Sequence, residues 1–261
     1  MKPGDGAVWD ETTLADRTDQ FKDKLDGQIQ KELARFAKLA AGIAPRLCPI
    51  CDYYGSFGPF GALLRYDARC PSCASLERHR LVWLMICRTG LLKKHHSLLH
   101  FAAEAVLRKH VQSLVGQYDT AELRQSANPD LVLNIEAIDL PDQSYDRVIC
   151  NHVLEHVNDC KALSEMFRIL RPGGVAVLTT PIVEGWAETY ENPAVTGKDA
   201  RLLHFGQKDH VRFFGKDLRD RIRAAGFKLD EMVATEPDVH RYGLMRGETV
   251  FMATKPEVEP A

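Results

Sequence analysis

The chain has 261 residues, of which 45% are hydrophobic and 27% charged, so it can bury a sizeable core. Its formal net charge of −2 excludes a broadly basic protein that coats nucleic acid and a protein dominated by a polyacidic tail. No apolar run reaches the ~18 residues of a membrane span. The first residues also lack the charged and apolar regions of a secretory signal. We therefore expect a soluble cytoplasmic protein with no membrane partner.

The first 44 residues are predicted to form a polar arm followed by an amphipathic helix. Between Arg17 and Ala41, apolar residues recur at three- and four-residue steps, at Phe21, Leu25, Ile29, Leu33, Phe36 and Ala40. Gly42 and Pro45 are predicted to end the helix. We expect its apolar face to pack on the main domain or on a partner rather than on a membrane surface.

Residues 45–75 contain four of the seven cysteines, arranged as Cys48-x2-Cys51 and Cys70-x2-Cys73 with eighteen residues between the pairs. An odd cysteine count without a signal sequence argues against a disulfide framework. Two such pairs at this spacing favour a small zinc ribbon, in which four thiolates close the coordination shell and the metal is structural. Four unrelated thiols, a redox CxxC pair and an iron–sulfur cluster are the alternatives.

The charge around the predicted ribbon bears on its partner. Residues 45–80 hold five basic and three acidic side chains, and four thiolates with one divalent zinc add −2. The net charge is therefore near zero, which makes a nucleic-acid partner possible but does not favour it. The alternative role that we expect for the ribbon is to shape a substrate pocket or an interface.

Residues 76–261 form the predicted main domain. A mostly buried helix is predicted over residues 76–92, and from Ser97 onward short apolar strands alternate with helices. The predicted strands are 97–101, 117–120, 131–135, 147–150, 175–179, 228–234 and 249–254, and the clearest helices are 161–170 and 216–225. This alternation predicts an α/β fold with a doubly wound, mostly parallel sheet of seven strands covered on both faces.

Three motifs follow one another in this domain: LPDQSYDRVIC, then NHVLEHV at 151–157, then LRPGG at 170–174. With these motifs, residues 97–254 resemble the class I S-adenosylmethionine-dependent methyltransferases of the type 11 branch. The cysteine quartet followed by SLERHR, and later HFGQKDHVRFFG, resembles a bacterial subgroup with a zinc ribbon in front. The resemblance implies a Rossmann-like methyltransferase fold, S-adenosylmethionine as cofactor, and methyl transfer to oxygen or nitrogen.

The resemblance also implies a cofactor site at the carboxyl ends of the strands. In this family the second strand ends with an acid for the ribose, and here Asp119 and Glu122 are available. The third strand usually ends with an acid near the adenine, where this chain has Asn134 and then Ile135. An amide oxygen can still accept that hydrogen bond.

The first predicted strand departs most from the family, which has an acid and a run of glycines there. This chain has instead His100, Phe101, Ala102, Ala103 and Glu104. Alanine is small enough for close approach of the backbone, and we expect Glu104 to pair with the ammonium group of the cofactor. The missing glycines also motivate an alternative, a methyltransferase fold that has lost catalysis and only binds.

The fourth predicted strand ends at Asn151 and His152, which we expect to face the cofactor cleft. Glu155 and His156 follow at once. Their order, HVLEH, is not the HExxH of zinc hydrolases, so we expect no catalytic metal there.

The stretch HFGQKDHVRFFG, residues 204–215, follows a long insertion that we expect to act as a lid. Residues 201–228 hold eight basic and three acidic side chains, and Arg212 is the predicted ligand for an anionic group of the substrate. For a hydroxyl acceptor, His210 is the predicted base, oriented by Asp209 or helped by His204.

The function predicted from these residues is S-adenosylmethionine-dependent O-methylation of a small molecule or glycan. One alternative is an RNA or protein methyltransferase that uses the ribbon for recognition, and the other is the non-catalytic binding protein. The sequence does not predict the acceptor or the oligomeric state.

Overall fold

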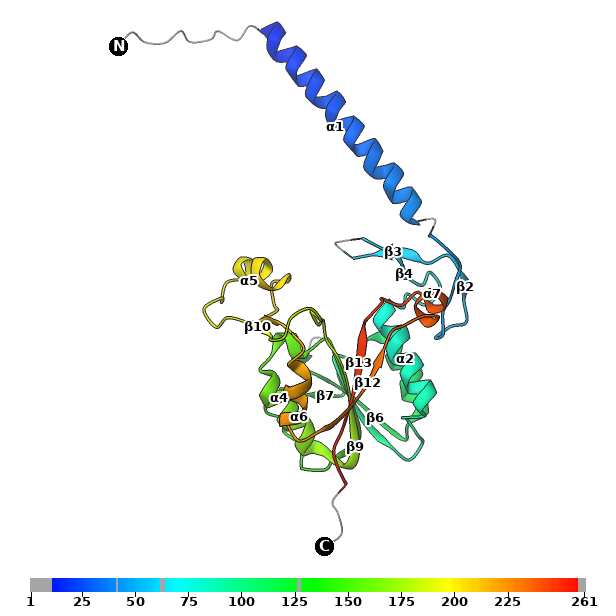
Figure 1. The fold of residues 1–261 in the computed structure, drawn as a ribbon, viewed down its shortest axis with the longest axis vertical. Helices are drawn as coiled ribbons and strands as arrows, with labels where there is room; N and C mark the ends of the chain where they lie inside the picture. The colour runs from blue at the N-terminus through cyan, green and yellow to red at the C-terminus, as the bar shows by residue number, and fades with distance from the viewer. Residues whose placement is uncertain (1–10, 41, 62–63, 126–127, 258–261) are drawn as a thin grey trace, which may run out of the picture.

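The computed structural model describes residues 11–40, 42–61, 64–125 and 128–257. Its centre is a seven-stranded sheet in the order β12-β13-β9-β8-β5-β6-β7 (Figure 1). Within this sheet β13 runs antiparallel to its two neighbours, β12 and β9, and the other pairs are parallel. The α/β, doubly wound fold predicted from the sequence is confirmed. The strands are β5 (Ser97–Phe101), β6 (Gln117–Glu122), β7 (Leu131–Val132), β8 (Tyr145–Asn151), β9 (Leu170–Thr179), β12 (Lys228–Val233) and β13 (Thr249–Thr254).

Helices cover both faces of the sheet, and each face has its own apolar cluster. On one face lie α2 (Glu77–Thr89) and α3 (Ala105–Val111), which contribute Leu81, Met85, Leu107 and Val111. On the other face lie α4 (Asp159–Ile169) and α6 (Leu218–Ala224), which contribute Leu163, Met166, Leu218 and Ile222. The two clusters account for the apolar runs of the central strands, because both faces of those strands are buried.

Most predicted elements are confirmed to within a few residues, and the third strand is the main exception. The prediction placed it at 131–135, but β7 is only Leu131–Val132. The side chain of Asn134 accepts a hydrogen bond from the amide of Glu136, and its carbonyl accepts one from Ala137. These two bonds form a turn, so the chain leaves the sheet before Asn134.

The cysteine-rich segment folds as two small hairpins against the start of α2. They are formed by β1 (Arg46–Leu47) with β2 (Tyr54–Gly55), and by β3 (Gly58–Phe60) with β4 (Arg65–Arg69). Cys48, Ile50 and Phe57 belong to the same apolar cluster as α2 and the sheet. The ribbon therefore has no separate core and is packed onto the main domain.

Arg80, in the first turns of α2, joins this assembly from inside. Its side chain is fully buried, and its guanidinium donates to the carbonyls of Ala68, Ser75, Tyr242 and Gly243. Tyr242 is the last residue of the short helix α7 (Asp238–Tyr242). One side chain thus connects the second hairpin, α2 and the segment after β12.

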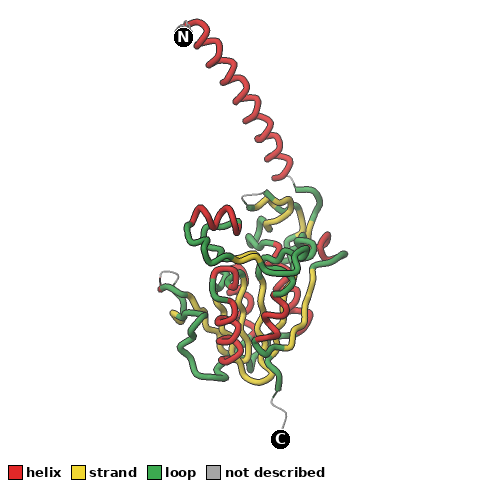
Figure 2. The backbone as a smooth tube through the Cα atoms, turned by 60° about the vertical axis from the view of Figure 1, so that its left-hand side comes forward, coloured by secondary structure: helices red, strands yellow, loops and turns green. Residues whose placement is uncertain are grey.

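The N-terminal helix α1 (Glu11–Ala40) projects from the body and touches it only near its C-terminal end (Figure 1, Figure 2). The predicted apolar stripe is present but exposed, from 44% at Leu25 to 67% at Phe21. The main domain therefore does not cover this stripe, and its packing on a partner, the other half of the expectation, stays a prediction. Among the described residues, no helix is long and apolar enough to cross a bilayer.

The insertion after β9 forms a segment of its own, residues 185–215, which we call the lid segment. It contains β10 (Tyr190–Glu191), α5 (Lys198–Phe205) and β11 (Arg212–Phe213), and β10 pairs with β11. A parallel bridge from Ile182 to Phe214 returns its end to the edge of the sheet. The lid segment therefore begins and ends beside the carboxyl end of β9.

Candidate functional site

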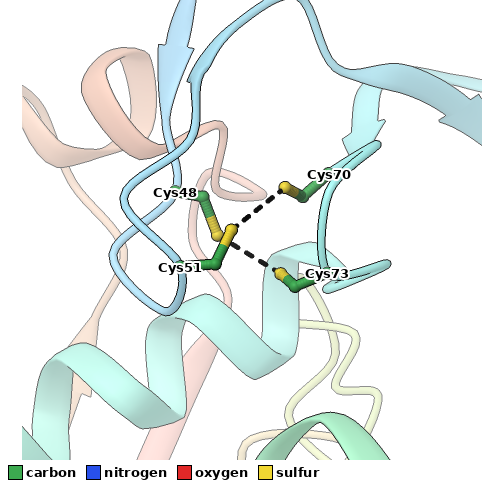
Figure 3. A group of neighbouring side chains, drawn as sticks. All are labelled: Cys48, Cys51, Cys70 and Cys73. Atoms are coloured by element: carbon green, nitrogen blue, oxygen red, sulfur yellow. Dashed lines mark hydrogen bonds between the residues drawn. The ribbon is translucent and has the colours of Figure 1, made fainter.

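The four predicted zinc ligands come together between the turn of the first hairpin, which holds Cys48 and Cys51, and the turn that follows β4, which holds Cys70 and Cys73 (Figure 3). The Sγ atoms of Cys48 and Cys73 are 3.6 Å apart, and those of Cys51 and Cys70 are 3.7 Å apart. Four sulfurs bonded at ~2.3 Å to one zinc ion lie ~3.8 Å from each other in a tetrahedron. A disulfide requires ~2.05 Å. The spacing therefore fits a four-thiolate metal site and not a pair of disulfides.

The two cysteine turns have the same backbone design. The residue after each second cysteine, Asp52 or Ala74, has a positive φ of 57° or 61°. In each turn that residue donates to the carbonyl of the first cysteine, Cys48 or Cys70. The repeated geometry points two thiolates of each turn toward one centre, which supports the predicted ribbon.

The second site lies where the parallel strands end. Register places Phe101 of β5 beside Ala121 of β6 and Cys150 of β8, so the residues that follow form one edge. Ala102 has a φ of 49°, and its amide donates to the carbonyl of Ala121. Alanine thus makes the left-handed turn for which glycine is the usual residue. The backbone turn of the predicted cofactor site is present without a glycine.

Glu104 follows this turn and is held from α2. Its Oε1 atom accepts from Nε2 of His79 at 2.7 Å and from Arg78 at 2.6 Å. Burial raises the pKa of Glu104, but the bonds from His79 and the charge of Arg78 outweigh it and lower the pKa to about 2. The carboxylate is therefore ionised, and its buried Oε2 atom has no hydrogen-bond partner. An unpartnered carboxylate oxygen can accept from an ammonium group, and its pairing with the cofactor stays a prediction.

Three more polar side chains at this edge have a buried atom without a partner: Nε2 of His100, Nδ2 of Asn151 and Nε2 of His152. His100 bonds Tyr118 through Nδ1 at 2.9 Å, and burial lowers its pKa to about 4, so it is neutral. Buried polar atoms are normally satisfied. A set of four, with Glu104, at the carboxyl ends of β5 and β8 fits a polar cofactor bound there.

The structure separates the two predicted ribose acids. Asp119 lies within β6, opposite Leu99, and its carboxylate accepts from the hydroxyl of Tyr145 at 2.7 Å. Glu122 is the last residue of β6 and lies at the carboxyl edge. Glu122 is therefore the better placed of the two. Of the predicted adenine contacts, Asn134 is exposed in its turn and Ile135 is buried in the apolar cluster.

A cavity of about 400 Å³ adjoins this edge at the ends of β9 and β13. Its walls include His152, Thr180, Pro181, Glu184, Met245 and Glu248. Glu248 has a buried Oε2 atom without a partner, and burial raises the pKa of its carboxyl to about 7. No motif marked Glu248 in the sequence. The place of Glu248 at this edge is visible only in the structure, where β13 lies antiparallel to β9.

The lid segment places the three predicted catalytic residues apart. His204 bonds Tyr190 at 2.6 Å within the lid segment, and the carboxylate of Asp209 lies 3.5 Å from Nδ1 of His156. His210 is buried against His156, with ring centroids 4.7 Å apart. Burial lowers the pKa of His210, so the imidazole is neutral, and its Nδ1 has no partner. No hydrogen bond between Asp209 and His210 is formed in the described structure.

Arg212 is held by protein groups. Its guanidinium donates to the carbonyls of Leu154 and Val157, and it forms ion pairs with Asp159 and Glu191. The side chain is buried, and these contacts join the lid segment to the turn after β8. The role of Arg212 as a ligand for a substrate anion stays a prediction. Such an anion would have to compete with the carboxylates of Asp159 and Glu191 for the guanidinium group.

Comparisons with known proteins agree with this geometry. Residues 102–178 match the family model of a methyltransferase domain. The chain is 38% identical over 124 residues to malonyl-[acyl-carrier protein] O-methyltransferase of Yersinia pestis, covering 44% of this chain and 46% of that protein. It is 47% identical over 100 residues to a probable S-adenosylmethionine-dependent methyltransferase of Mycolicibacterium smegmatis, covering 38% and 34%. The chain thus spans less than half the length of these two relatives.

Solved structures show the same fold at low identity. The [4+2]-cyclase SpnF superposes with a TM-score of 0.52 at 17% identity, covering 69% of this chain and 82% of that one. A complex of the Haloferax volcanii Trm112 methyltransferase activator with a putative methyltransferase gives 0.51 at 16% identity, covering 69% and 91%. Because the first of these is a cyclase, the fold alone does not assign the reaction. The family match covers residues 102–178, which include β6, β7, β8 and all of β9 but its last residue, so this part of the sheet is similar to a methyltransferase domain.

Proposed function

We propose that this protein is an S-adenosylmethionine-dependent methyltransferase that methylates an oxygen of a small molecule or glycan. The observation that carries the proposal is the set of buried, unpartnered polar atoms of His100, Glu104, Asn151 and His152 beside a cavity of about 400 Å³. When bound, S-adenosylmethionine supplies a methyl group on a positively charged sulfur. The chain's task is then to hold donor and acceptor in line and to exclude water.

The residues at the carboxyl edge divide the binding of the cofactor among them. Oε2 of Glu104 would receive the ammonium group, and Glu122 would accept from the ribose hydroxyls. The left-handed turn at Ala102 allows the backbone to approach closely. The unpartnered nitrogens of Asn151 and His152 would form hydrogen bonds with the cofactor on the side of the cavity.

The acceptor would occupy the cavity at the ends of β9 and β13. Glu248 lines this cavity, and a carboxyl group with a pKa of about 7 is suited to take a proton from a hydroxyl near neutral pH. His210, the base predicted from the sequence, has the free lone pair it needs but is not among the residues lining this cavity. We therefore propose Glu248 as the base and keep His210 as the alternative.

The cysteine quartet would hold one structural zinc ion. Its four thiolates leave no position for a substrate, and the ribbon packs on α2. A role of the ribbon in reading RNA or protein would have to use its outer surface.

Two measurements on the full chain test this function. Calorimetric titration with S-adenosylmethionine should show binding at one site. A turnover screen against metabolite and glycan pools should then show a mass gain of one methyl group and release of S-adenosylhomocysteine. Absence of cofactor binding would favour the non-catalytic alternative, and binding without turnover on either pool would contradict the proposed acceptor class.

A further inference from the structure

A second cluster of possible metal ligands lies between the turn after β8 and the lid segment. Glu155 and His156 belong to the 3-10 turn η3 (Leu154–His156), and His210 comes from the end of the lid segment. One ligand atom from each lies within 4.8 Å of the others. Glu155 and His210 are buried, with 2% and 3% exposure, so this is no chance grouping of surface acids.

Both histidines are oriented by partners on the side away from the cluster. Nδ1 of His156 lies 3.3 Å from the carbonyl and 3.5 Å from the carboxylate of Asp209, which places a proton on Nδ1 and a lone pair on Nε2. His210 bonds the carbonyl of Phe205, and its buried Nδ1 has no partner. Metal-binding histidines characteristically donate their second N–H to a carbonyl or carboxylate in this way.

Glu155 has the same kind of support. Its Oε2 atom accepts from the hydroxyl of Thr180 at 2.8 Å, and its Oε1 atom lies 3.3 Å from Nδ1 of His152. Thr180 and His152 both line the cavity of about 400 Å³. Glu155 therefore joins the cluster to that cavity through two side chains of its wall.

We propose that Glu155, His156 and His210 bind one divalent transition-metal cation of the zinc type. One carboxylate and two imidazole nitrogens are a donor set that such cations take, and three protein ligands leave a coordination position open. Three ligands bonded at ~2.1 Å to one ion lie ~3 to 3.5 Å apart. Binding would thus draw the three side chains together by about 1 Å, a movement within reach of small side-chain rotations.

The open position gives the cation a task that the cysteine quartet does not have. Binding of the cation depends on these three residues alone, whereas its use rests on the proposed function: it would hold the oxygen of the acceptor and make its proton easier to remove. In that case His210 acts on the acceptor through the cation. The sequence prediction of no metal at HVLEH considered only local spacing and did not include His210, which lies 54 positions beyond His156.

The test counts metal on the full chain without any cofactor. The protein is equilibrated with excess Zn²⁺ or, separately, Co²⁺, passed through gel filtration, and analysed for bound metal. We expect about two equivalents in the wild type and about one in His210→Ala and Glu155→Gln. His204→Ala is the matched control, because this neighbouring histidine bonds Tyr190 and should leave both equivalents in place.

Cobalt spectra assign the equivalent that is lost. The thiolate-to-cobalt absorption comes only from the quartet, so His210→Ala should keep it while the weaker visible bands of the nitrogen and oxygen site disappear. Circular dichroism checks that each variant is folded, and His156→Gln serves if His210→Ala is not. The proposal would be overturned if the wild type bound one equivalent of either metal. It would also be overturned if the variants of Glu155, His156 and His210 each kept two equivalents. Two equivalents without binding of S-adenosylmethionine would support the cation site while contradicting the proposed function.

Discussion

The Nε2 atom of His79 lies 2.7 Å from Oε1 of Glu104, and this contact joins two parts of the chain that the sequence shows as separate. His79 is in the first turn of α2, which starts four residues after Cys73, and its Nδ1 accepts from the amide of Leu76. Glu104 is in the predicted cofactor site. The ribbon is thus linked to that site by a single turn of helix.

Removing the metal from the quartet should therefore weaken binding of S-adenosylmethionine. Cys70→Ser should lose the quartet's zinc equivalent, lower the melting temperature by ~5 °C or more, and weaken cofactor binding severalfold, because Arg78 and His79 lose their fixed position. Metal analysis, a thermal melt and calorimetry measure the three effects. Cys160→Ser is the control, since Cys160 is exposed on α4. Unchanged cofactor affinity in zinc-free, folded protein would contradict the link.

The two acids of β6 should behave differently. Glu122→Gln should weaken binding of S-adenosylmethionine by ~10-fold or more, because a hydrogen bond to a charged group contributes ~1.5–3 kcal/mol. Asp119→Asn should leave the affinity within about twofold and lower the stability instead, since its carboxylate bonds Tyr145 inside the sheet. Calorimetry and urea denaturation separate the two effects. The assignment of the ribose contact to Glu122 is wrong if only Asp119→Asn weakens binding.

Buried Arg80 should be far more important for stability than its neighbour Arg88. Arg80→Met leaves several buried carbonyls without a donor and should cost ~3–5 kcal/mol. Arg88→Met removes a partly exposed ion pair with Asp238 and should cost less than ~1 kcal/mol. Urea denaturation of the two variants, both changes on α2, measures the difference. Equal costs would show that the carbonyl bonds of Arg80 add little.

The sequence predicted the fold well where the signal is local and continuous. The run at 97–101 is buried at every position, so its strand was placed with the right bounds. The prediction failed where a polar side chain ends an element, as Asn134 does after β7. What covers the stripe of α1 is also not predictable, because an apolar stripe does not specify what it packs against.

The candidate sites show the same division. The cysteine quartet was predictable because its ligands form two short, regular motifs. Glu248 and the Glu155–His156–His210 cluster were not, because each depends on strands or segments far apart in the sequence meeting at one edge of the sheet. Ala102 lies between these cases: its position follows from the strand before it, but its left-handed backbone is visible only in the structure.

The buried carboxyl of Glu248 should make stability depend on pH in a way that one substitution removes. Its pKa is about 7 in the folded chain against an ordinary value of 4.5, and burial is the main cause. Below pH 4.5 the group is protonated in both states and costs nothing. Between pH 4.5 and 7 the unfolded chain releases this proton while the folded chain keeps it, so the cost grows with pH and levels off above pH 7 at ~3 kcal/mol. Stability of the wild type should therefore fall between about pH 4.5 and 7 and then level off, relative to Glu248→Gln.

Urea denaturation of both proteins across this pH range measures the difference, and Glu184→Gln is the control. Glu184 lines the same cavity but pairs with Arg219, so its removal should not flatten the pH profile. If Glu248 is also the base, methyl transfer by the wild type should rise with pH through about 7, and Glu248→Gln should lose most of its turnover while retaining cofactor affinity. A pH-dependent stability difference without loss of turnover would leave Glu248 as a buried acid only and return the role of base to His210.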